Sequence, residues 1–462
     1  MIDQAETERS RDPLHTLLRR AVDVRPDEIR ALLTSFAFFF FLLGSYFVLR
    51  PIRDAVAAAS GVSKLPWLFA GTLAVTLAFN PLFSGLVVRF PIRRVIPISY
   101  HFFVANILAF YAVLRFTGIA EGSTVDVWVG RTFFVWTTVF ALFNTSIFWS
   151  LMADVFRSDQ AKRMFGFIGV GGTLGSIAGS AATAALAPKI GAVNLLLVSA
   201  VLLELAIFTV VRFPLQGQGG GVAPRRGRRR ADDDERDVIG GSVWAGFTKV
   251  MQSPYLLGIC AFLILYTIGS TFLYFEQADI VGRYYADRTA RTEVLAKLEL
   301  AAQVLTVITQ IFFTGRIIRW LGLAVTLALL PAMSILGFGA LGAIPAFETL
   351  AIFTVLRRAS NFALTNPAME VLFTVVPRED KYKAKNIIET FVYRGGDQLG
   401  AWVYAGLAAM GLSLAGISFA AVPLGVIWLF LGLWLGKKQA SLAGAGEARN
   451  PKVSGEPAVA VT

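Results

Sequence analysis

Cysteine, histidine and charge are scarce in this 462-residue chain. The one cysteine, Cys260, lies in an apolar stretch, which excludes a disulfide framework and a cysteine-rich metal site. The two histidines, His15 and His101, are too isolated to form a metal pair or a catalytic constellation. Charged residues make up 16% of the chain and hydrophobic residues 55%, which excludes an ordinary soluble protein. We expect no metal, no cofactor and no enzymatic activity.

Two sequence signatures are also missing. No G-x-x-x-x-G-K-[ST] motif occurs, so a pump with its own nucleotide-hydrolysing domain is not expected. The polar stretch up to Arg30 holds no short apolar core with a cleavage site, so no signal peptide is predicted.

Long apolar stretches recur along the whole chain. About 20 apolar residues suffice for a helix to cross the hydrocarbon core of a bilayer. We therefore predict an all-α membrane protein with twelve transmembrane helices in two six-helix bundles. The predicted spans are 31–50, 66–89, 95–115, 126–152, 163–187, 190–211, 255–279, 296–315, 320–342, 347–376, 386–410 and 413–436.

A polar break separates the two sets of six spans. Its core, residues 216–237, is glycine-rich, then basic, then acidic, and is typical of a flexible, solvated linker. The predicted segments are a cytoplasmic N-terminal segment 1–30, a bundle 31–211, a cytoplasmic linker 212–254, a bundle 255–436 and a cytoplasmic tail 437–462.

The positive charges favour one face of the membrane. Counted from a cytoplasmic N-terminus, 30 of the 43 Lys and Arg residues fall in cytoplasmic segments and nine in the opposite loops. This bias places both termini in the cytoplasm, and we expect a multi-pass protein of a bacterial inner membrane. The net charge of +12 then reflects topology and contact with membrane lipids, not nucleic acid.

The two halves repeat one design. Gly85-x-x-x-Arg89 follows the second predicted span, and Gly315-x-x-x-Arg319 follows the eighth. These turns resemble the GxxxD(R/K)xGRR turn of the major facilitator superfamily, with Arg in place of the usual Asp. The resemblance implies two bundles that rock about a midplane substrate site.

Three stretches resemble the nucleotide exchangers of plastids and intracellular bacteria, the ATP/ADP translocase family. They are VLRPIRDAV (48–56), FWSLMADVFRSDQAKRMFGFIGVGG (148–172) and RRASNFALTNPAMEVLFTVVPREDKYKAK (357–385). By position, Arg53 stands where these exchangers have a functional Lys. The chain departs from them near Thr137, where they carry a Glu, and near Asp397, where they carry a Lys. The resemblance implies transport of a small anionic metabolite, with ATP/ADP exchange as one candidate.

The charges at the end of the first span suggest an anion site. Arg50 and Asp54, at i and i+4, are expected to pair and to leave Arg53 for the substrate, because a guanidinium grips phosphate or carboxylate with its planar fork. The alternative is a structural pair on the outer surface, with Pro51 ending the helix.

Other polar residues within spans are candidate substrate contacts, with buried ion pairs or helix-to-helix hydrogen bonds as the alternative. Arg357 and Arg358 point about 100° apart, so at most one faces a cavity comfortably. The full set of predicted substrate residues is Arg50, Arg53, Asp54, Arg131, Asn144, Arg357, Arg358, Asn366 and Arg394.

Acidic residues within spans are candidates for coupling or gating. Glu276 and Asp279 stand at i and i+3, which suits a gate or proton site, or else a position at the membrane edge. Arg394 and Asp397 stand at the same spacing and can neutralise each other. The predicted coupling or gating residues are Glu276, Asp279, Glu389, Asp397, Arg89 and Arg319; Glu204, Glu299 and Glu370 also lie in spans and receive no role.

The glycine-rich run 169–180 looks like a phosphate-binding loop but lacks a preceding strand. Gly171, Gly175 and Gly179 instead predict a small-residue stripe that lets two helices approach closely.

Taken together, these patterns predict a secondary transporter of an anionic metabolite that works by alternating access. Two alternatives stay open. A proton-coupled exporter of hydrophobic or drug-like compounds would use Glu276 and Glu389 as proton sites. A non-transporting membrane scaffold or sensor would use the linker as its output. The oligomeric state cannot be read from the sequence.

Overall fold

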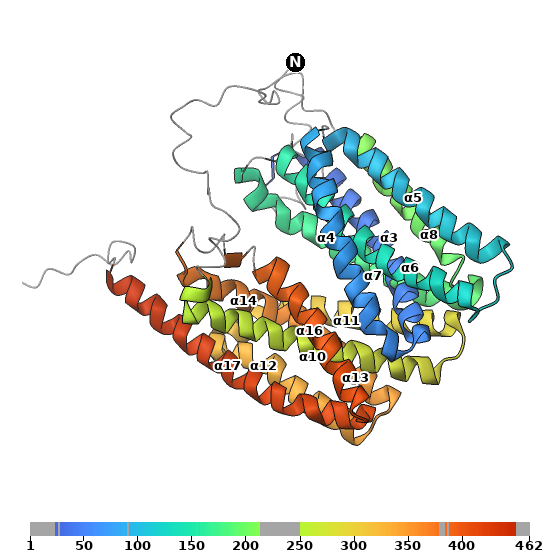
Figure 1. Ribbon diagram of the computed structural model, residues 1–462. Coiled ribbons are helices and arrows are strands. Elements are labelled where there is room, and N and C mark those ends of the chain that lie inside the picture. Colours follow the sequence, from blue (N-terminus) through green and yellow to red (C-terminus); the bar gives the residue numbers. More distant parts are fainter. Residues whose placement is uncertain are drawn as a thin grey trace, which may run out of the picture. The chain divides into compact units, whose positions relative to one another are not determined.

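The computed structural model describes residues 24–25, 28–89, 92–156, 158–212, 250–377, 384–385 and 388–449. Within these residues the chain folds into helices joined by turns, with no strand (Figure 1). Of the predicted linker 212–254, residues 213–249 lie outside the described residues. Packing contacts divide the chain into two units, which are described separately.

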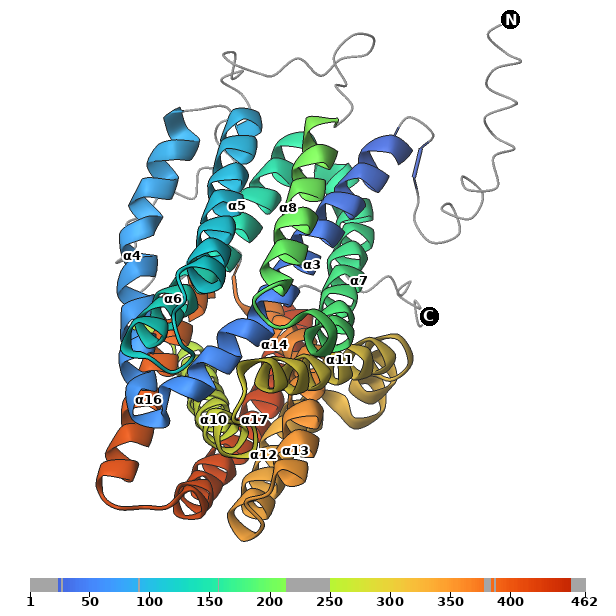
Figure 2. The same ribbon diagram turned by 90° about the vertical axis from the view of Figure 1, so that its right-hand side faces the viewer.

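The first unit holds the helices of the N-terminal half together with residues 281–303. These helices are α3 (Ile29–Ser60), α4 (Leu65–Arg89), α5 (Ile92–Phe116), α6 (Thr124–Val155), α7 (Ser158–Ile190) and α8 (Leu195–Val211). Helix α3 packs against α6, α7 and α8, and α5 packs against α6 and α8 (Figure 2). An apolar core that includes Phe38, Phe39 and Phe148 fills the space between them.

The second unit runs up to Ile280 and resumes at Val304. Its helices are α10 (Pro254–Tyr284) and α11 (Arg288–Phe312), each in part, and α12 (Thr314–Ala343), α13 (Phe347–Ser360), α14 (Asn366–Leu372), α16 (Tyr393–Ala409) and α17 (Leu414–Arg449). The boundary between the two units therefore runs through α10 and α11. The sequence places both helices wholly in the second bundle, and this predicted division into bundles stays a proposal.

Close contact between α3 and α7 depends on the predicted glycine stripe. A Cβ atom added at Gly171 would lie 2.6 Å from the carbonyl oxygen of Phe36. One added at Gly175 would overlap the carbonyl group of Phe40, and one at Gly179 would overlap that of Gly44. The predicted packing role of the stripe is confirmed, because only glycine lets the two backbones come this close.

Helix α3 continues well beyond the expected span end at residue 50. Pro51 does not end it, because the helix runs on to Ser60 and stops at Gly61, whose φ is 80°. Pro51 has no backbone N–H, so the helix lacks one hydrogen bond there, but its ring is buried together with the neighbouring Leu49 and Ile52. The alternative in which Pro51 ends the helix is wrong, and Arg50, Arg53 and Asp54 all lie inside α3.

Eight of the described helices are long and apolar enough to cross a bilayer, among them α3, α10 and α17. Each of the twelve predicted spans overlaps a described helix or a run of short helices, and the span 296–315 runs past the end of α11 into α12. The all-α membrane fold is confirmed, and the count of twelve crossings stays a prediction. Gly191, with a φ of 81°, ends α7 and delays the start of α8 to Leu195.

Candidate functional site

An ion-pair cluster joins α3 to α11 within the first unit. Arg53 donates to the Oδ1 atom of Asp54 from Nε at 2.9 Å and from Nη2 at 2.7 Å. Arg50 donates from Nη1 to the Oε1 atom of Glu299 at 3.4 Å, and its Nε lies 3.9 Å from Asp54. Two cations and two carboxylates thus meet, and their formal charges cancel.

This arrangement keeps the predicted contact of Arg50 with Asp54, at 3.9 Å, and corrects the expectation for Arg53. Arg50 was expected to pair with Asp54 and to leave Arg53 for the substrate. Arg53 instead makes the short contacts to Asp54, and the nearer acid for Arg50 is Glu299 on another helix. The reason is tertiary: Glu299, with a side chain only 3% exposed, needs a cation within its buried surroundings.

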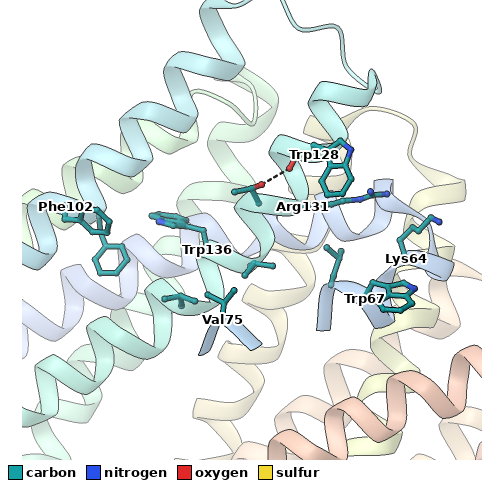
Figure 3. Close-up of a pocket in the computed structure, with 12 residues that line it drawn as sticks. Lys64, Trp67, Val75, Phe102, Trp128, Arg131 and Trp136 are labelled. Atoms are coloured by element: carbon teal, nitrogen blue, oxygen red, sulfur yellow. Dashed lines mark hydrogen bonds between the residues drawn. The ribbon is translucent and has the colours of Figure 1, made fainter. Parts of the chain in front are cut away.

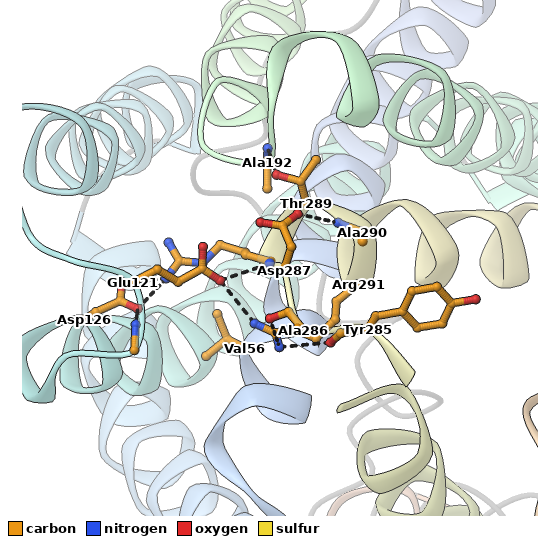
Figure 4. Close-up of polar contacts among 12 residues, drawn as sticks. Val56, Glu121, Asp126, Ala192, Tyr285, Ala286, Asp287, Thr289, Ala290 and Arg291 are labelled. Atoms are coloured by element: carbon orange, nitrogen blue, oxygen red, sulfur yellow. Dashed lines mark hydrogen bonds and ion pairs between the residues drawn. The ribbon is translucent and has the colours of Figure 1, made fainter. Parts of the chain in front are cut away.

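A second cluster, the α6–α11 cluster, is formed by Glu121, Asp126, Arg288 and Arg291 (Figure 4). The Nη2 atom of Arg288 lies 2.5 and 2.6 Å from the two carboxylate oxygens of Asp126. Arg291 donates to Glu121 at 3.3 Å and to the backbone carbonyl oxygen of Ala286 at 2.8 Å. A cavity of about 560 Å³ lies against this cluster and the end of α3.

The sequence reasoning missed the α6–α11 cluster. Asp126 has only a local signal, because it stands three residues after Ser123 in an N-terminal capping arrangement in which Ser123 accepts from the Asp126 backbone amide. That signal predicts a helix start and not an ion pair. Nothing in the sequence connects Asp126 to Arg288, 162 residues further on.

In the second unit, Arg357 carries a buried charge without a carboxylate partner in the described part. The residue is 3% exposed. Its guanidinium donates to Ser270 Oγ at 3.0 Å, to Ser334 Oγ at 3.3 Å and to the backbone carbonyl oxygen of Tyr266 at 3.2 Å. It also lies 5.4 Å from the centre of the Tyr266 ring. All of these partners are neutral.

The helix that carries Arg357 changes its winding just beyond it. Residues Asn361–Thr365 form a π-helical turn between α13 and α14, a feature often found at functional sites. Asn361 donates from Nδ2 to the Tyr266 hydroxyl at 2.9 Å. Arg357 and Asn361 thus meet at the same tyrosine of α10.

Arg131 and Asn144 lie on α6 with different surroundings. Asn144 is 1% exposed and donates to the backbone oxygen of Phe140, four residues earlier on its own helix, at 2.8 Å, so this bond is not the helix-to-helix bond of the alternative. Its Oδ1 atom is buried and has no hydrogen-bond partner among the described residues. The Arg131 guanidinium lies 5.0 Å from the ring of Trp128.

The remaining predicted substrate residues are not brought together around Arg357. Arg358 is half-buried, and Asn366 is exposed at the start of α14. Arg394 and Asp397 form the expected neutralising pair on α16, with Nη1 and Oδ2 4.0 Å apart.

The predicted coupling residues are scattered. Glu276 is fully buried and accepts a hydrogen bond from Ser418 on α17 at 2.6 Å, whereas Asp279 is half-buried. Arg319 is exposed in the short helical stretch before Gly322, where the backbone turns out of the helix. The side chains of Arg89 and Glu389 lie outside the described residues.

No protein-family model matches the chain. ADP,ATP carrier protein 2 of Chlamydia trachomatis serovar D is 26% identical over 219 residues, which cover 42% of this chain and 40% of the relative. ADP,ATP carrier protein 1 of Chlamydia pneumoniae is 21% identical over 477 residues, covering 89% of this chain and 90% of the relative. The match to the first relative therefore spans less than half of its length.

Solved structures show the same fold at low sequence identity. The xylose transporter XylE from E. coli, in an inward open conformation, gives a TM-score of 0.56 at 15% identity over 87% of this chain and 95% of that chain. A POT family transporter in complex with a thioalcohol conjugated peptide gives 0.59 at 9% identity over 89% and 96%.

These findings define the class: the chain is an all-α, multi-pass membrane protein with the fold of the major facilitator transporters. Its relatives and structural neighbours are transporters and not enzymes. Within this class it resembles the ADP,ATP carriers, as the three sequence motifs indicate.

Proposed function

We propose that the protein is a secondary transporter of an anionic metabolite and works by alternating access. The observation that carries the substrate class is the guanidinium of Arg357. A buried cation with only neutral partners is unfavourable by several kcal/mol unless an opposite charge joins it. An anionic substrate would supply that charge, and intramembrane ionisable residues commonly mark substrate paths.

The surroundings of Arg357 suit this role. Ser270 and Ser334 hold the guanidinium in a fixed orientation, and Tyr266 adds a ring against which its planar face can rest. Neutral oxygens orient the cation without cancelling its charge. An incoming phosphate or carboxylate would therefore meet a preoriented cation and little competition from protein carboxylates.

The α3–α11 cluster behaves differently, because its cations are already paired. For Arg53 to bind substrate, the anion must compete with Asp54 for the same guanidinium. Such an exchange of partners would form one step of the transport cycle. We retain Arg50, Arg53 and Asp54 as proposed substrate residues, together with Arg131, Asn144, Arg358, Asn366 and Arg394.

A nucleotide of the ADP or ATP type is the proposed substrate, and exchange of one for another the proposed reaction. Support comes from the ADP,ATP carriers that this chain resembles. Coupling is proposed for Glu276, Asp279, Glu389 and Asp397, and Arg89 and Arg319 are proposed as latches. The 30 to nine distribution of cations supports a bacterial inner membrane location with both termini cytoplasmic.

The proposal is tested with purified protein in lipid nanodiscs and in proteoliposomes. Binding of nucleotides, phosphorylated metabolites and organic anions is screened by thermal shift, and uptake of the best binder is then measured. Arg357→Gln should lower affinity about tenfold to hundredfold, since a hydrogen bond to a charged group contributes about 1.5 to 3 kcal/mol. Arg357→Lys should retain part of the affinity.

Arg316→Gln is the matched control. Arg316 is an exposed arginine of the same unit whose side chain donates to the carbonyl oxygen of Phe312 on the preceding turn. If no anion binds, or if Arg357→Gln binds as tightly as the parent while folded, the anionic class is wrong. A protein that binds but moves nothing would be a sensor.

One observation favours the proton-coupled alternative. Glu276 is fully buried, its Oε1 accepts from Ser418, and its Oε2 has no partner among the described residues. A lone buried carboxyl group of this kind is suited to carry a proton. Glu276→Gln keeps the shape and the bond to Ser418, so it should abolish proton-driven flux and leave anion exchange intact. Loss of both would assign Glu276 a structural role.

A further inference from the structure

A groove of about 640 Å³ opens between α4, α5 and α6 of the first unit (Figure 3). None of the α3 residues of the ion-pair cluster lines it. Its volume lies within the range of about 300 to 1,000 Å³ that is usual for small-molecule sites. Of its lining residues, only Arg131 has a role in the transport proposal.

The wall of the groove is apolar and rich in tryptophan. Trp67, Trp128 and Trp136 line it, with Phe102 and Val75 among the other apolar residues (Figure 3). Trp67 is 65% exposed and Trp128 is 60% exposed. Large exposed indole rings are typical of the level at which a membrane protein meets lipid headgroups.

The charged side chains of the groove are positive and lie toward one of its ends. Among the described residues that line it, Lys64 and Arg131 are charged and none is acidic. Both cations lie toward the end of the groove marked by Trp67 and Trp128, whereas Phe102 and Trp136 lie toward the other end (Figure 3). The Nε atom of Arg131 is buried and has no hydrogen-bond partner among the described residues.

The depth of Arg131 matches that of a lipid phosphate. Helix α6 has 32 residues and is therefore about 48 Å long, whereas the hydrocarbon core is about 30 Å thick. If α6 stands upright and is centred on the bilayer, about 9 Å of it extends past the hydrocarbon core at each end. Arg131 is the eighth residue of α6, about 10 Å from its start, which in that arrangement is the boundary between headgroups and acyl chains. Lys64 precedes α4 on the same side.

We propose that this groove binds an anionic phospholipid. Its phosphate lies between Lys64 and Arg131, and an acyl chain follows the apolar wall past Val75 toward Phe102 and Trp136. A soluble anion would leave the apolar wall without a partner, and a zwitterionic lipid would bring its own ammonium group close to the two cations. The proposal does not rest on the transport function.

The test uses detergent-purified, delipidated protein. Phosphatidylglycerol should raise its melting temperature by several degrees, and native mass spectrometry should show one retained lipid. Phosphatidylcholine and inorganic phosphate should produce little of either effect. Lys64→Gln with Arg131→Gln should remove most of the stabilisation and of the retained lipid. Lys64→Gln alone, at an exposed position, should remove part of it.

Two further variants sharpen the result. Arg115→Gln removes an exposed arginine at the end of α5, outside the groove, and should leave lipid retention unchanged. Val75→Phe fills the apolar wall and should reduce retention while both cations remain. The proposal is overturned if the double variant retains lipid like the parent, if phosphatidylcholine stabilises equally, or if phosphate alone gives the full shift.

Discussion

Arg53 donates two hydrogen bonds to Asp54, its immediate neighbour in α3. Adjacent residues on a helix point about 100° apart, so the long arginine side chain must fold back along the helix to reach the carboxylate. Both side chains are largely buried, at 13% and 10% exposed. The guanidinium proposed to receive the substrate is therefore already engaged in the present conformation.

The first prediction concerns this pair. Arg53→Ala should weaken substrate binding about tenfold to hundredfold, because a charge-assisted hydrogen bond contributes about 1.5 to 3 kcal/mol. Arg53→Lys should retain part of the affinity, since it keeps the charge and loses the fork. Isothermal titration with the substrate identified by the screen measures both. Equal affinity in Arg53→Ala would make Arg53 and Asp54 a structural pair.

The second prediction concerns Asp126 and Arg288. Each side chain is mostly buried, so removing one partner leaves an uncompensated charge, and Asp126→Asn should lower the free energy of unfolding by about 3 kcal/mol. Arg288→Gln should cost a similar amount, and the double variant should cost less than the sum. Denaturation in detergent checks this. Strict additivity would show that the two residues do not interact in solution.

The third prediction concerns the contact between α3 and α7. Gly175→Ala places a methyl group against the carbonyl group of Phe40 and should destabilise the protein by about 1 to 3 kcal/mol. Gly169→Ala on the same helix meets no atom within 4 Å and serves as the control. Thermal unfolding of the two variants compares them. Similar melting temperatures would mean that the helices are not in close contact.

The fourth prediction concerns Glu28, which is 2% exposed just before α3. Burial alone would raise the pKa of its carboxyl group, but hydrogen bonds from the Arg25 amide, Gln160 and Arg163, with the charge of Arg163, outweigh burial and lower it below 4.5. A carboxyl group whose pKa is lowered by folding stabilises the fold at pH values above its pKa in the unfolded chain. This stabilisation is lost as the pH falls through its pKa in the folded protein.

The melting temperature should therefore fall on acidification below about pH 4.5, and less steeply in Glu28→Gln. Asp154→Asn, at an exposed position near the end of α6, is the control and should follow the parent curve. A Glu28→Gln curve parallel to the parent would remove Glu28 from the acid response.

The fifth prediction concerns topology. Reporter fusions after residue 212 and after residue 449 should both report a cytoplasmic location, because cations concentrate in those segments. Fusions within the loop 117–123 should report the opposite side. A cytoplasmic signal from that loop would contradict the proposed order in which successive loops lie on opposite sides of the membrane.

Local composition was enough to determine the membrane class, the positions of the helices and the glycine stripe of α7. Each of these depends on short-range physics: the free energy of burying apolar residues, helical periodicity, and the absence of a side chain at Gly171, Gly175 and Gly179. The local pattern also selected Arg357 as a cation at membrane depth. It could not show that Ser270 and Ser334 surround it with neutral oxygens.

Only the tertiary structure decided which charges meet. Arg50 finds Glu299, 249 residues away, and Arg288 finds Asp126 across 162 residues. Arg50 keeps its predicted contact with Asp54 at 3.9 Å, but Arg53 is not left for the substrate, because helical spacing specifies which residues share a face and not which other partners compete for them. A buried carboxylate on another helix can compete with a local carboxylate for the same arginine. An unpaired carboxylate in a low-dielectric interior is more unfavourable in free energy than a rearranged, flexible arginine side chain.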